Sequence, residues 1–281
     1  MVELFENIEP DLVKGRIKVF LLNFIDLSHP ILQEIGRLRA ETFGQIGAGT
    51  DKPVDLDDND TKYTHIVVID EVDIIGSYRV SVMDNLIKDG KLISHVNNYY
   101  ELDETFYSQS NQLMELGRSF IQRKYWSGNY LDYLWYGIGL YVKRNPTIKY
   151  MYGSISVGNN YSDTAKNYMK AYVEKWYACY DGSVKPRYEF KEIKEDYEYF
   201  KSQLVNTEPK KDLKLLNKKL EEMGFNVPPL LKKYLNITEE GGARIMATGY
   251  EPTFKASSFF ILLKIDALKD LYKDRYFLFL K

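Results

Sequence analysis

The sequence predicts a mixed α/β or α+β fold built as one domain. Apolar runs of strand length alternate with segments of helical period along most of the chain, and there is no internal repeat. The 281 residues are 44% hydrophobic and 15% aromatic, which suffices to bury a core as one large domain or two small ones. We therefore expect a central sheet flanked by helices, with residues 1–281 forming a single domain.

The N-terminal part reads as a strand, a helix and a hairpin. Residues 17–23 have a strand pattern, and residues 30–44 repeat apolar side chains at helical spacing. Residues 45–60 are rich in glycine and aspartate and are expected to form a loop. Residues 64–70 and 73–82 then predict two strands joined by a tight turn.

The middle of the chain is less regular. Residues 84–111 mix polar and aromatic residues without a clear period, which favours loop and short helix. Residues 112–121 predict a strand. Residues 129–145 place apolar side chains on one helical face, with Asn129 as the expected N-cap and Pro146 as the stop.

The C-terminal half contains a highly charged segment, residues 186–226, which we expect to be an insertion. Within it, residues 210–224 predict a solvated amphipathic helix that ends at Gly224. The elements around the insertion are, in order, a strand, a helix, a second helix and a strong strand: 149–158, 163–177, 228–235 and 257–266.

Composition excludes several classes of function. The chain has 38 Lys and Arg against 40 Asp and Glu, a net charge of -2, so no basic excess indicates a nucleic-acid partner. No run of about eighteen apolar residues predicts a membrane span, and no signal pattern opens the chain, so we expect a cytoplasmic protein. Cys179 and the three histidines, His29, His65 and His95, provide neither a disulfide framework nor a Cys/His metal site.

The strand at 112–121, QLMELGRSFI, carries two charged residues inside an apolar run. In a regular strand Glu115 and Arg118 would point to opposite faces, because side chains alternate. Gly117 between them is compatible with a β-bulge, which re-aims side chains and often lies beside an active site. The alternative is an internal ion pair that ties this strand to its neighbour, and these ten residues alone do not separate the two interpretations.

Motifs around this strand resemble a known family. GSYRV, with Arg79 at the end of a hairpin strand, is followed about forty residues later by ELGRSFI. This resembles the Gcn5-related N-acyltransferase (GNAT) fold, and more narrowly the branch of autoinducer synthases and ornithine- or glycine-lipid N-acyltransferases, described as hemolysin-like. Segments such as LWYGIGLYV and PPLLKKYLNI are similar to the lipid-forming enzymes. The resemblance covers roughly residues 17–275 and implies a GNAT-like domain with a splayed, bulged central sheet.

Two earlier motifs add to the resemblance. RLRAETF is similar to the N-terminal signature of that branch at Arg39 and Phe43. DLDDND followed by YTHIVVID is similar to its acidic loop at Asp57, Asp60 and His65. The resemblance implies that the two aspartates order a lid loop by pairing with arginines, whereas composition alone favours a solvated turn. His65 begins a strand, and a role in packing alone is the alternative for this residue.

The resemblance implies an amide-forming bacterial acyltransferase of lipid biosynthesis. A long-chain acyl or 3-hydroxyacyl group would pass from acyl carrier protein, where it is a phosphopantetheine thioester, or from acyl-CoA, to the amine of a small amino acid. The product would be an N-acyl amino acid or lyso-aminolipid. No metal is expected. So apolar a product implies peripheral contact with the inner face of the membrane.

The chemistry assigns expected roles to the charged residues. The acceptor ammonium must lose a proton, and Glu115 is the expected base, directly or through a water. Burial would raise its pKa and a nearby arginine would lower it. Three arginines are expected to organise the catalytic site, one of them by binding the acceptor carboxylate: Arg39, Arg79 and Arg118.

The acyl donor is expected along the bulged strand and the segment after it. Acetyl-CoA enzymes of this fold hold the pyrophosphate with a glycine-rich loop, but QRKYWSGN has one glycine here, which favours a carrier-protein donor. Aromatic residues of the following helix could line an acyl tunnel, although a plain core is the commoner explanation. The expected donor-binding residues are Gly117, Ser119, Phe120, Arg123, Lys124, Gly128 and Trp135.

Three other functions stay open on the sequence. One is an acyl-homoserine-lactone synthase that takes S-adenosylmethionine as acceptor, which the long C-terminal half argues against. Another is an N-acetyltransferase that uses short acyl-CoA. The last is a catalytically silent module that binds a fatty acyl ligand, which the intact set of charged residues argues against.

Overall fold

An eight-stranded sheet forms the centre of the computed structural model, which describes residues 2–278. The strand order is β1-β2-β3-β4-β8-β9-β12-β11, and the pairing is antiparallel throughout except between β8 and β9. The strands are β1 (Leu12–Lys14), β2 (Ile17–Asn23), β3 (Thr64–Ile69), β4 (Ile74–Val82), β8 (Leu113–Ile121), β9 (Tyr150–Val157), β11 (Ala243–Glu251) and β12 (Ala256–Lys264). Two short antiparallel pairs of strands lie outside this sheet: β5 (Ile87–Lys88) with β6 (Lys91–Leu92), and β7 (Tyr100–Leu102) with β10 (Val184–Pro186).

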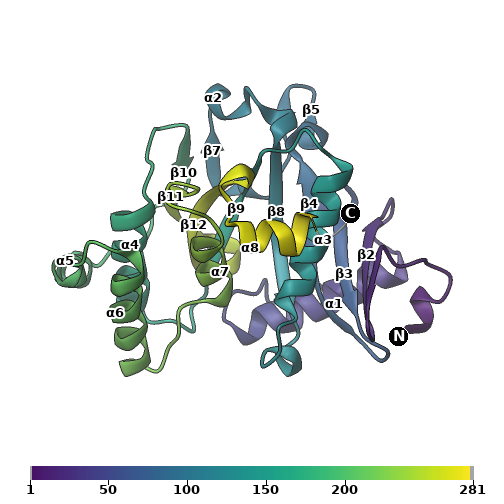
Figure 1. Cartoon of the computed structure of the whole chain (residues 1–281), viewed down its shortest axis with the longest axis horizontal. Helices are drawn as coiled ribbons and strands as arrows, with labels where there is room; N and C mark the ends of the chain where they lie inside the picture. Colours follow the sequence, from purple (N-terminus) through teal and green to yellow (C-terminus); the bar gives the residue numbers. More distant parts are fainter. Residues whose placement is uncertain (1, 279–281) are drawn as a thin grey trace.

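Helices cover both faces of the sheet (Figure 1). They are α1 (Pro30–Gln45), α2 (Glu104–Tyr107), α3 (Leu131–Arg144), α4 (Asp163–Tyr177), α5 (Lys194–Gln203), α6 (Pro209–Glu222), α7 (Pro229–Ile237) and α8 (Asp270–Lys273). Consecutive side chains of β3 point to opposite faces of the sheet. Ile66 packs in the core cluster that includes α3, whereas Val67 packs in the cluster that includes α1. The sheet is therefore the middle layer of the fold.

Most predicted elements are present, and the mixed α+β class is confirmed. Two details differ. β11 lies at a sheet edge in a segment for which no strand is predicted. α3 begins at Leu131 after Tyr130, and no side chain caps it, so the expected N-cap at Asn129 is wrong. Ser162 does cap α4, through a hydrogen bond from the Ala165 N–H to its hydroxyl.

The charged segment 186–226 contains α5 and α6, both of which lie beside α4 (Figure 1). α6 buries one stripe, with Leu213, Leu216 and Leu220 inside, and exposes most of its lysines. Gly224 follows α6 with a φ of 80°, the left-handed conformation that glycine adopts without strain after a helix. The predicted amphipathic helix and its stop are therefore present.

The predicted β-bulge is present in β8. Ser77 of β4 pairs with Phe120 and Arg79 pairs with Gly117, so two residues of β8 lie opposite Tyr78 alone. The residue in the left-handed conformation is Arg118, with a φ of 56°, and not the glycine. Such backbone strain in a non-glycine residue is uncommon and clusters at functional sites.

β8 also separates from β9. The two parallel strands pair only at their first residues, from Leu113 with Tyr150 to Glu115 with Tyr152. Beyond that point β8 continues to Ile121 and β9 to Val157 without pairing to each other. The splayed sheet expected from the sequence is therefore confirmed, and the gap opens beside the bulge.

Candidate functional site

A chain of ion pairs links the three predicted arginines to the acidic loop. Arg39 of α1 binds both carboxylate oxygens of Asp60, at 2.9 Å from Nη1 and 2.8 Å from Nη2. Arg79 of β4 approaches the same carboxylate at 3.0 Å and Asp57 at 3.1 Å. Burial alone would raise the pKa of Asp60, but the charges of Arg39 and Arg79 outweigh it and hold that pKa well below its ordinary value.

The same aspartates shape the loop locally. The Asp57 side chain accepts a hydrogen bond from the Asn59 N–H at 2.9 Å, and Asp60 accepts one from the Asp57 N–H at 2.8 Å. This is a capping box around the short helical turn Asp58–Thr61. Asp57 and Asp60 therefore order the loop by pairing with arginines, which is the arrangement that the resemblance implies and not a solvated turn.

His65 is a buried part of this network and does not line a cavity. Its Nε2 lies 2.8 Å from the carbonyl oxygen of Asp60. Burial lowers the pKa of His65 to about 4, against the opposing charge of Asp60, so the ring is neutral at neutral pH. The observed contacts give His65 a packing role beneath the loop.

Glu115 is completely buried on the same face of the sheet. Its carboxylate accepts hydrogen bonds from the hydroxyls of Tyr63 at 2.9 Å and Tyr152 at 3.0 Å, and from the Val96 N–H at 3.3 Å. Burial raises the pKa of Glu115 above its ordinary value, and these hydrogen bonds only partly offset that effect. Within residues 2–278, Glu115 forms no ion pair with Arg118, so the predicted internal pair is absent.

Arg118 reaches a different carboxylate, that of Asp55, through a hydrogen bond from Nη2. Its guanidinium lies over the ring of Phe254, 4.3 Å from the centroid, and 5.2 Å from that of Phe43. The Arg118 side chain is 5% exposed, and its Nε has no hydrogen-bond partner among the residues described. Burial lowers the pKa of Arg118 to about 10, which leaves it charged at neutral pH.

A cavity of about 350 Å³ lies against Arg118. The acidic loop forms one wall, the segment around His95 a second, and the turn between β11 and β12 a third. Its lining is Thr50, Lys52, Asp55, Leu56, Asp57, His95, Asn98, Tyr99, Arg118, Tyr188, Pro252, Thr253 and Phe254. A salt bridge of 2.6 Å between Asp51 and Lys255 connects the first and third walls.

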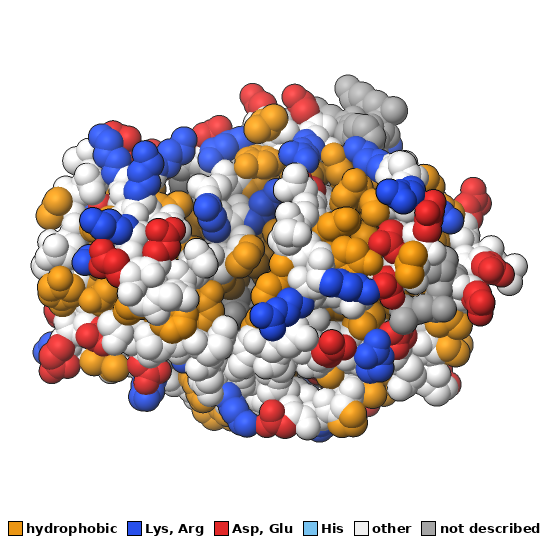
Figure 2. All heavy atoms as spheres, turned by 90° about the horizontal axis from the view of Figure 1, so that it is seen from below, with side chains coloured by type: hydrophobic (Ala, Val, Ile, Leu, Met, Phe, Trp, Pro, Cys, Tyr) orange, Lys and Arg blue, Asp and Glu red, His pale blue; other side chains and the backbone are white. Residues whose placement is uncertain are grey.

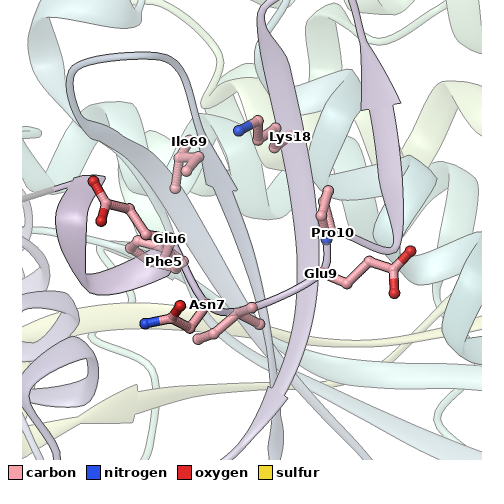
Figure 3. Close-up of a pocket in the computed structure, with 8 residues that line it drawn as sticks. Phe5, Glu6, Asn7, Glu9, Pro10, Lys18 and Ile69 are labelled. Carbon is pink, nitrogen blue, oxygen red and sulfur yellow. The ribbon is translucent and has the colours of Figure 1, made fainter.

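A cavity of about 380 Å³ is lined by Arg123 and Lys124, two predicted donor-binding residues, but by none of the ion-pair network or Glu115. The one drawn in Figure 3, of about 430 Å³, is lined by N-terminal residues such as Phe5 and Glu6 together with Lys18 and Ile69. It lies at the β1–β2–β3 side of the sheet and contains none of the predicted site residues. The cavity beside Arg118 is therefore the candidate active site.

The predicted site residues fall into two groups. The structure brings together Arg39, Phe43, Asp57, Asp60, His65, Arg79, Glu115, Gly117 and Arg118. Ser119 lies in the bulge, and Phe120 is buried in the core cluster with α1. Arg123, Lys124 and Gly128 lie in the connection from β8 to α3, where Lys124 pairs with Asp73. Trp135 is fully buried against Tyr234 and Tyr276 and is not among the residues that line the cavity beside Arg118.

Several residues of the site were not predicted. Asp55 pairs with Arg118, Tyr63 and Tyr152 hold Glu115, and His95 lines the cavity. Asp55 is part of the acidic loop and so had a local signal. His95 had none, because the segment 84–111 has no periodic pattern from which its neighbours could be inferred.

Within residues 2–278 no group of three His, Cys, Asp or Glu side chains is placed to hold a metal ion. Over the same residues no helix has both the length and the apolar character needed to cross a bilayer.

Comparison with known proteins relates the chain to acyltransferases. Residues 38–136 match the family model described as an acetyltransferase (GNAT) domain. A glycine N(alpha)-acyltransferase of Phocaeicola vulgatus is 28% identical over 240 residues, which is 80% of this chain and 73% of that protein. One of Bacteroides thetaiotaomicron is 27% identical over 223 residues, or 74% and 66%.

Solved structures were also compared. The acyl-homoserine-lactone synthase LasI has a TM-score of 0.47 and 10% identity, with 94% of this chain and 95% of that one covered. FeeM, an N-acyl amino acid synthase from uncultured soil microbes, has a TM-score of 0.45 and 10% identity, with 94% and 96% covered.

Proposed function

The chain is an amide-forming acyltransferase with a GNAT domain, and we propose that it acylates the amine of a small amino acid, with glycine as the first candidate. The acyl group is a long-chain acyl or 3-hydroxyacyl group held as a thioester on acyl carrier protein. The product is an N-acyl amino acid or lyso-aminolipid. The name of the two bacterial relatives supports glycine as the acceptor.

The observation that carries this proposal is that Arg118 lines the cavity and has a guanidinium nitrogen, Nε, without a hydrogen-bond partner among the described residues. Arg39 and Arg79 are both engaged by the aspartates of the loop, and neither lines the cavity. Arg118 does line it, and its buried Nε has no partner within the described chain. A carboxylate bound there would receive the charge-assisted hydrogen bond that this nitrogen lacks. Arg118 is therefore our candidate for holding the acceptor carboxylate.

The remaining arginines hold the wall of the cavity. Asp60 joins Arg39 to Arg79, and the loop it belongs to supplies Asp55 and Asp57 to the lining. A loop fixed in this way keeps Arg118 oriented and limits the entry of water, which favours attack by a neutral amine.

The donor is proposed to enter the gap between β8 and β9. Past Glu115 the β8 backbone has no partner on that side, so the amides of a phosphopantetheine arm could pair there like an added strand. Acetyl-CoA enzymes of this fold hold the pyrophosphate with a glycine-rich loop, whereas the connection before α3 has the single glycine Gly128. This supports a carrier-protein donor over free CoA.

An acidic carrier protein is proposed to dock where β8 ends. The connection from β8 to α3 lies at the lower edge of Figure 1, and Figure 2 views that side, where lysines and arginines are interspersed with acidic residues around a hollow. Arg123 and Lys124 belong to this connection, and Trp126 beside them is 49% exposed. The same aromatic side chain could also contact a membrane surface when the apolar product leaves.

The test is an assay of the purified protein with defined substrates. Long-chain acyl carrier protein, long-chain acyl-CoA and acetyl-CoA are each offered with glycine and with a panel of other amino acids, and products are identified by mass spectrometry. We expect an N-acyl amino acid, formed most efficiently from the carrier protein. Product from acetyl-CoA alone would replace this proposal with short-chain acetyl transfer, and no amide from any pair would refute it.

The R118K variant tests the acceptor site. Lysine keeps the charge but loses the planar fork, so we expect the KM for the amino acid to rise by about tenfold or more. R37K is the matched control, because Arg37 is an exposed residue of α1 paired only with Glu34 and Glu41. An unchanged KM in folded R118K would remove Arg118 from the acceptor site.

A further inference from the structure

The imidazole of His95 lies in the wall of the cavity, and its ring nitrogens form no hydrogen bond with the described residues. Its backbone N–H donates to the hydroxyl of Tyr63 at 3.2 Å, and its carbonyl oxygen accepts from the Asn98 N–H at 3.2 Å. Within residues 2–278 neither ring nitrogen has a hydrogen-bond partner. The residue is 7% exposed and lines the same cavity as Arg118.

Aromatic packing holds the ring beside Arg118. The His95 ring lies 5.5 Å from that of Tyr99 and 5.5 Å from that of Phe254, centroid to centroid. Phe254 also contacts the Tyr99 ring, 5.7 Å between centroids, and the Arg118 guanidinium, 4.3 Å from the ring centroid. A small amino acid whose carboxylate binds Arg118 would have its amine one carbon away from that carboxylate, inside the cavity that His95 also lines.

Glu115 is close to His95 but does not reach the cavity. The hydroxyl of Tyr63 bridges the Glu115 carboxylate and the His95 N–H, and the next residue, Val96, donates its N–H to the same carboxylate oxygen. Glu115 is fully buried and is not among the lining residues. Its hydrogen bonds thus fix the backbone that carries the imidazole.

We propose that the imidazole of His95 accepts the proton from the acceptor ammonium, and that Glu115 is a positioning residue that holds His95 in place. This inference rests on the proposed function, because it requires an amine acceptor in the cavity beside Arg118. It changes the role expected for Glu115, which becomes indirect.

The charges around the ring favour its neutral form. Burial lowers the pKa of His95 well below its ordinary value, and the positive charges of Arg79, Arg118 and Arg39 act in the same direction, against Asp57. A neutral ring has a free lone pair for a proton. An acceptor carboxylate bound at Arg118 offsets one of those positive charges and so makes the bound ring a stronger base than the free one.

The step balances within ordinary amide formation from a thioester. The ammonium gives one proton to the ring nitrogen, and the amine lone pair then forms the C–N bond at the thioester carbonyl carbon. The C–S bond breaks and its electron pair leaves on sulfur. The amine nitrogen loses a second proton as the amide forms. Of the two protons, one ends on the sulfur as a thiol and one passes to solvent.

Three variants test the proposal in the assay described above. H95Q keeps most of the side-chain volume without a basic ring, and we expect its kcat to fall about 10²-fold while the KM for the amino acid changes little. H95A leaves a space, and added imidazole should restore part of its turnover. H29N is the matched control, because the exposed His29 caps α1 outside the lining of this cavity and asparagine is a good N-cap residue.

The outcomes separate this inference from the proposed function. No product from the unaltered protein refutes the proposed function itself. Product from it together with unchanged kcat in H95Q refutes the role of His95 alone. Thermal melting establishes that the variants fold. If H95A does not fold, H95Q decides by its kcat. If a folded H95A loses turnover that imidazole does not restore in any measure, His95 is a packing residue and the proposal fails.

Discussion

Replacing Asp60 with asparagine tests whether the arginine network stabilises the fold. Asp60 is fully buried and its carboxylate is shared by Arg39 and Arg79. Asparagine has nearly the same shape, so D60N removes the charge and leaves two buried guanidinium groups without their common anion. Asp57, whose side chain is 37% exposed, pairs with Arg79 and so compensates one of the two charges.

The expected loss follows from the burial of the pairs. Removing one partner of a buried ion pair costs about 3–5 kcal/mol, because the other charge stays buried and uncompensated. With an unfolding entropy of about 2.1 cal/mol/K per residue over 281 residues, this loss lowers the melting temperature by about 5–8 °C. Arg39 keeps its contact of 3.2 Å with Asp55, but Asp55 also binds Arg118, so D60N leaves the three arginines with only Asp55 and Asp57 as partners within the described part of this network.

Differential scanning calorimetry of the unaltered protein, D60N and D58N measures this loss. Asp58 belongs to the same helical turn but is exposed, so D58N is the matched control and should melt close to the unaltered protein. A shift in D60N no larger than that in D58N would refute the view that the network stabilises the fold.

A pH series adds an independent check. The pKa of Asp60 is lower in the folded chain than in the unfolded one, so the unfolded chain takes up its proton first as the pH falls. The stabilisation from Asp60 is therefore complete above about pH 4 and is lost below it. D60N should show a shallower loss of stability below about pH 4 than the unaltered protein, and parallel curves would contradict this account.

Two further predictions concern the proton path and the packing of α3. E115Q should lower kcat by about tenfold or more. The E115Q/H95Q double variant should be little slower than H95Q, because both residues serve one step. If the two losses in kcat instead multiply in full, the residues have independent roles. G139A should destabilise the fold by about 1–3 kcal/mol in chemical denaturation, because an added methyl group on α3 would collide with the Tyr276 carbonyl oxygen. G44A, in α1 with open space around it, is the control and should be neutral or stabilising. Equal effects of the two glycine variants would show that α3 and the C-terminal turn are not in close contact.

The bulge in β8 illustrates what local sequence can predict. Two charges three residues apart in an apolar strand, with a glycine between them, predict an irregularity, and the register shift is where the pattern places it. The strained residue is Arg118. The left-handed conformation follows from how β8 leaves β9 and from the anchoring of the guanidinium between Asp55 and Phe254, and those partners come from distant segments.

The ionic network was predictable for a related reason. Asp57 and Asp60 lie one turn apart and cap their own helical turn, so their arrangement is largely local. The prediction that they pair with arginines came from the resemblance and not from local sequence, because Arg39 and Arg79 lie about twenty residues before and after them. Trp135 shows the limit of this reasoning, since an aromatic stripe on a helix is equally compatible with a tunnel and a core. The contacts with Tyr234 and Tyr276 place it in the core.

The sequence by itself determined the alternation of strands and helices, the amphipathic α6 with its glycine stop, and the position of the bulge in β8. These depend on periodicity and short-range hydrogen bonding, which neighbouring residues specify. Only the tertiary structure decided that Arg118 and His95 line the cavity while Glu115 lies behind it. The physical reason is that the walls come from the acidic loop, the segment around His95 and the β11–β12 turn, which only the packing of the whole sheet brings to within one side-chain length of each other.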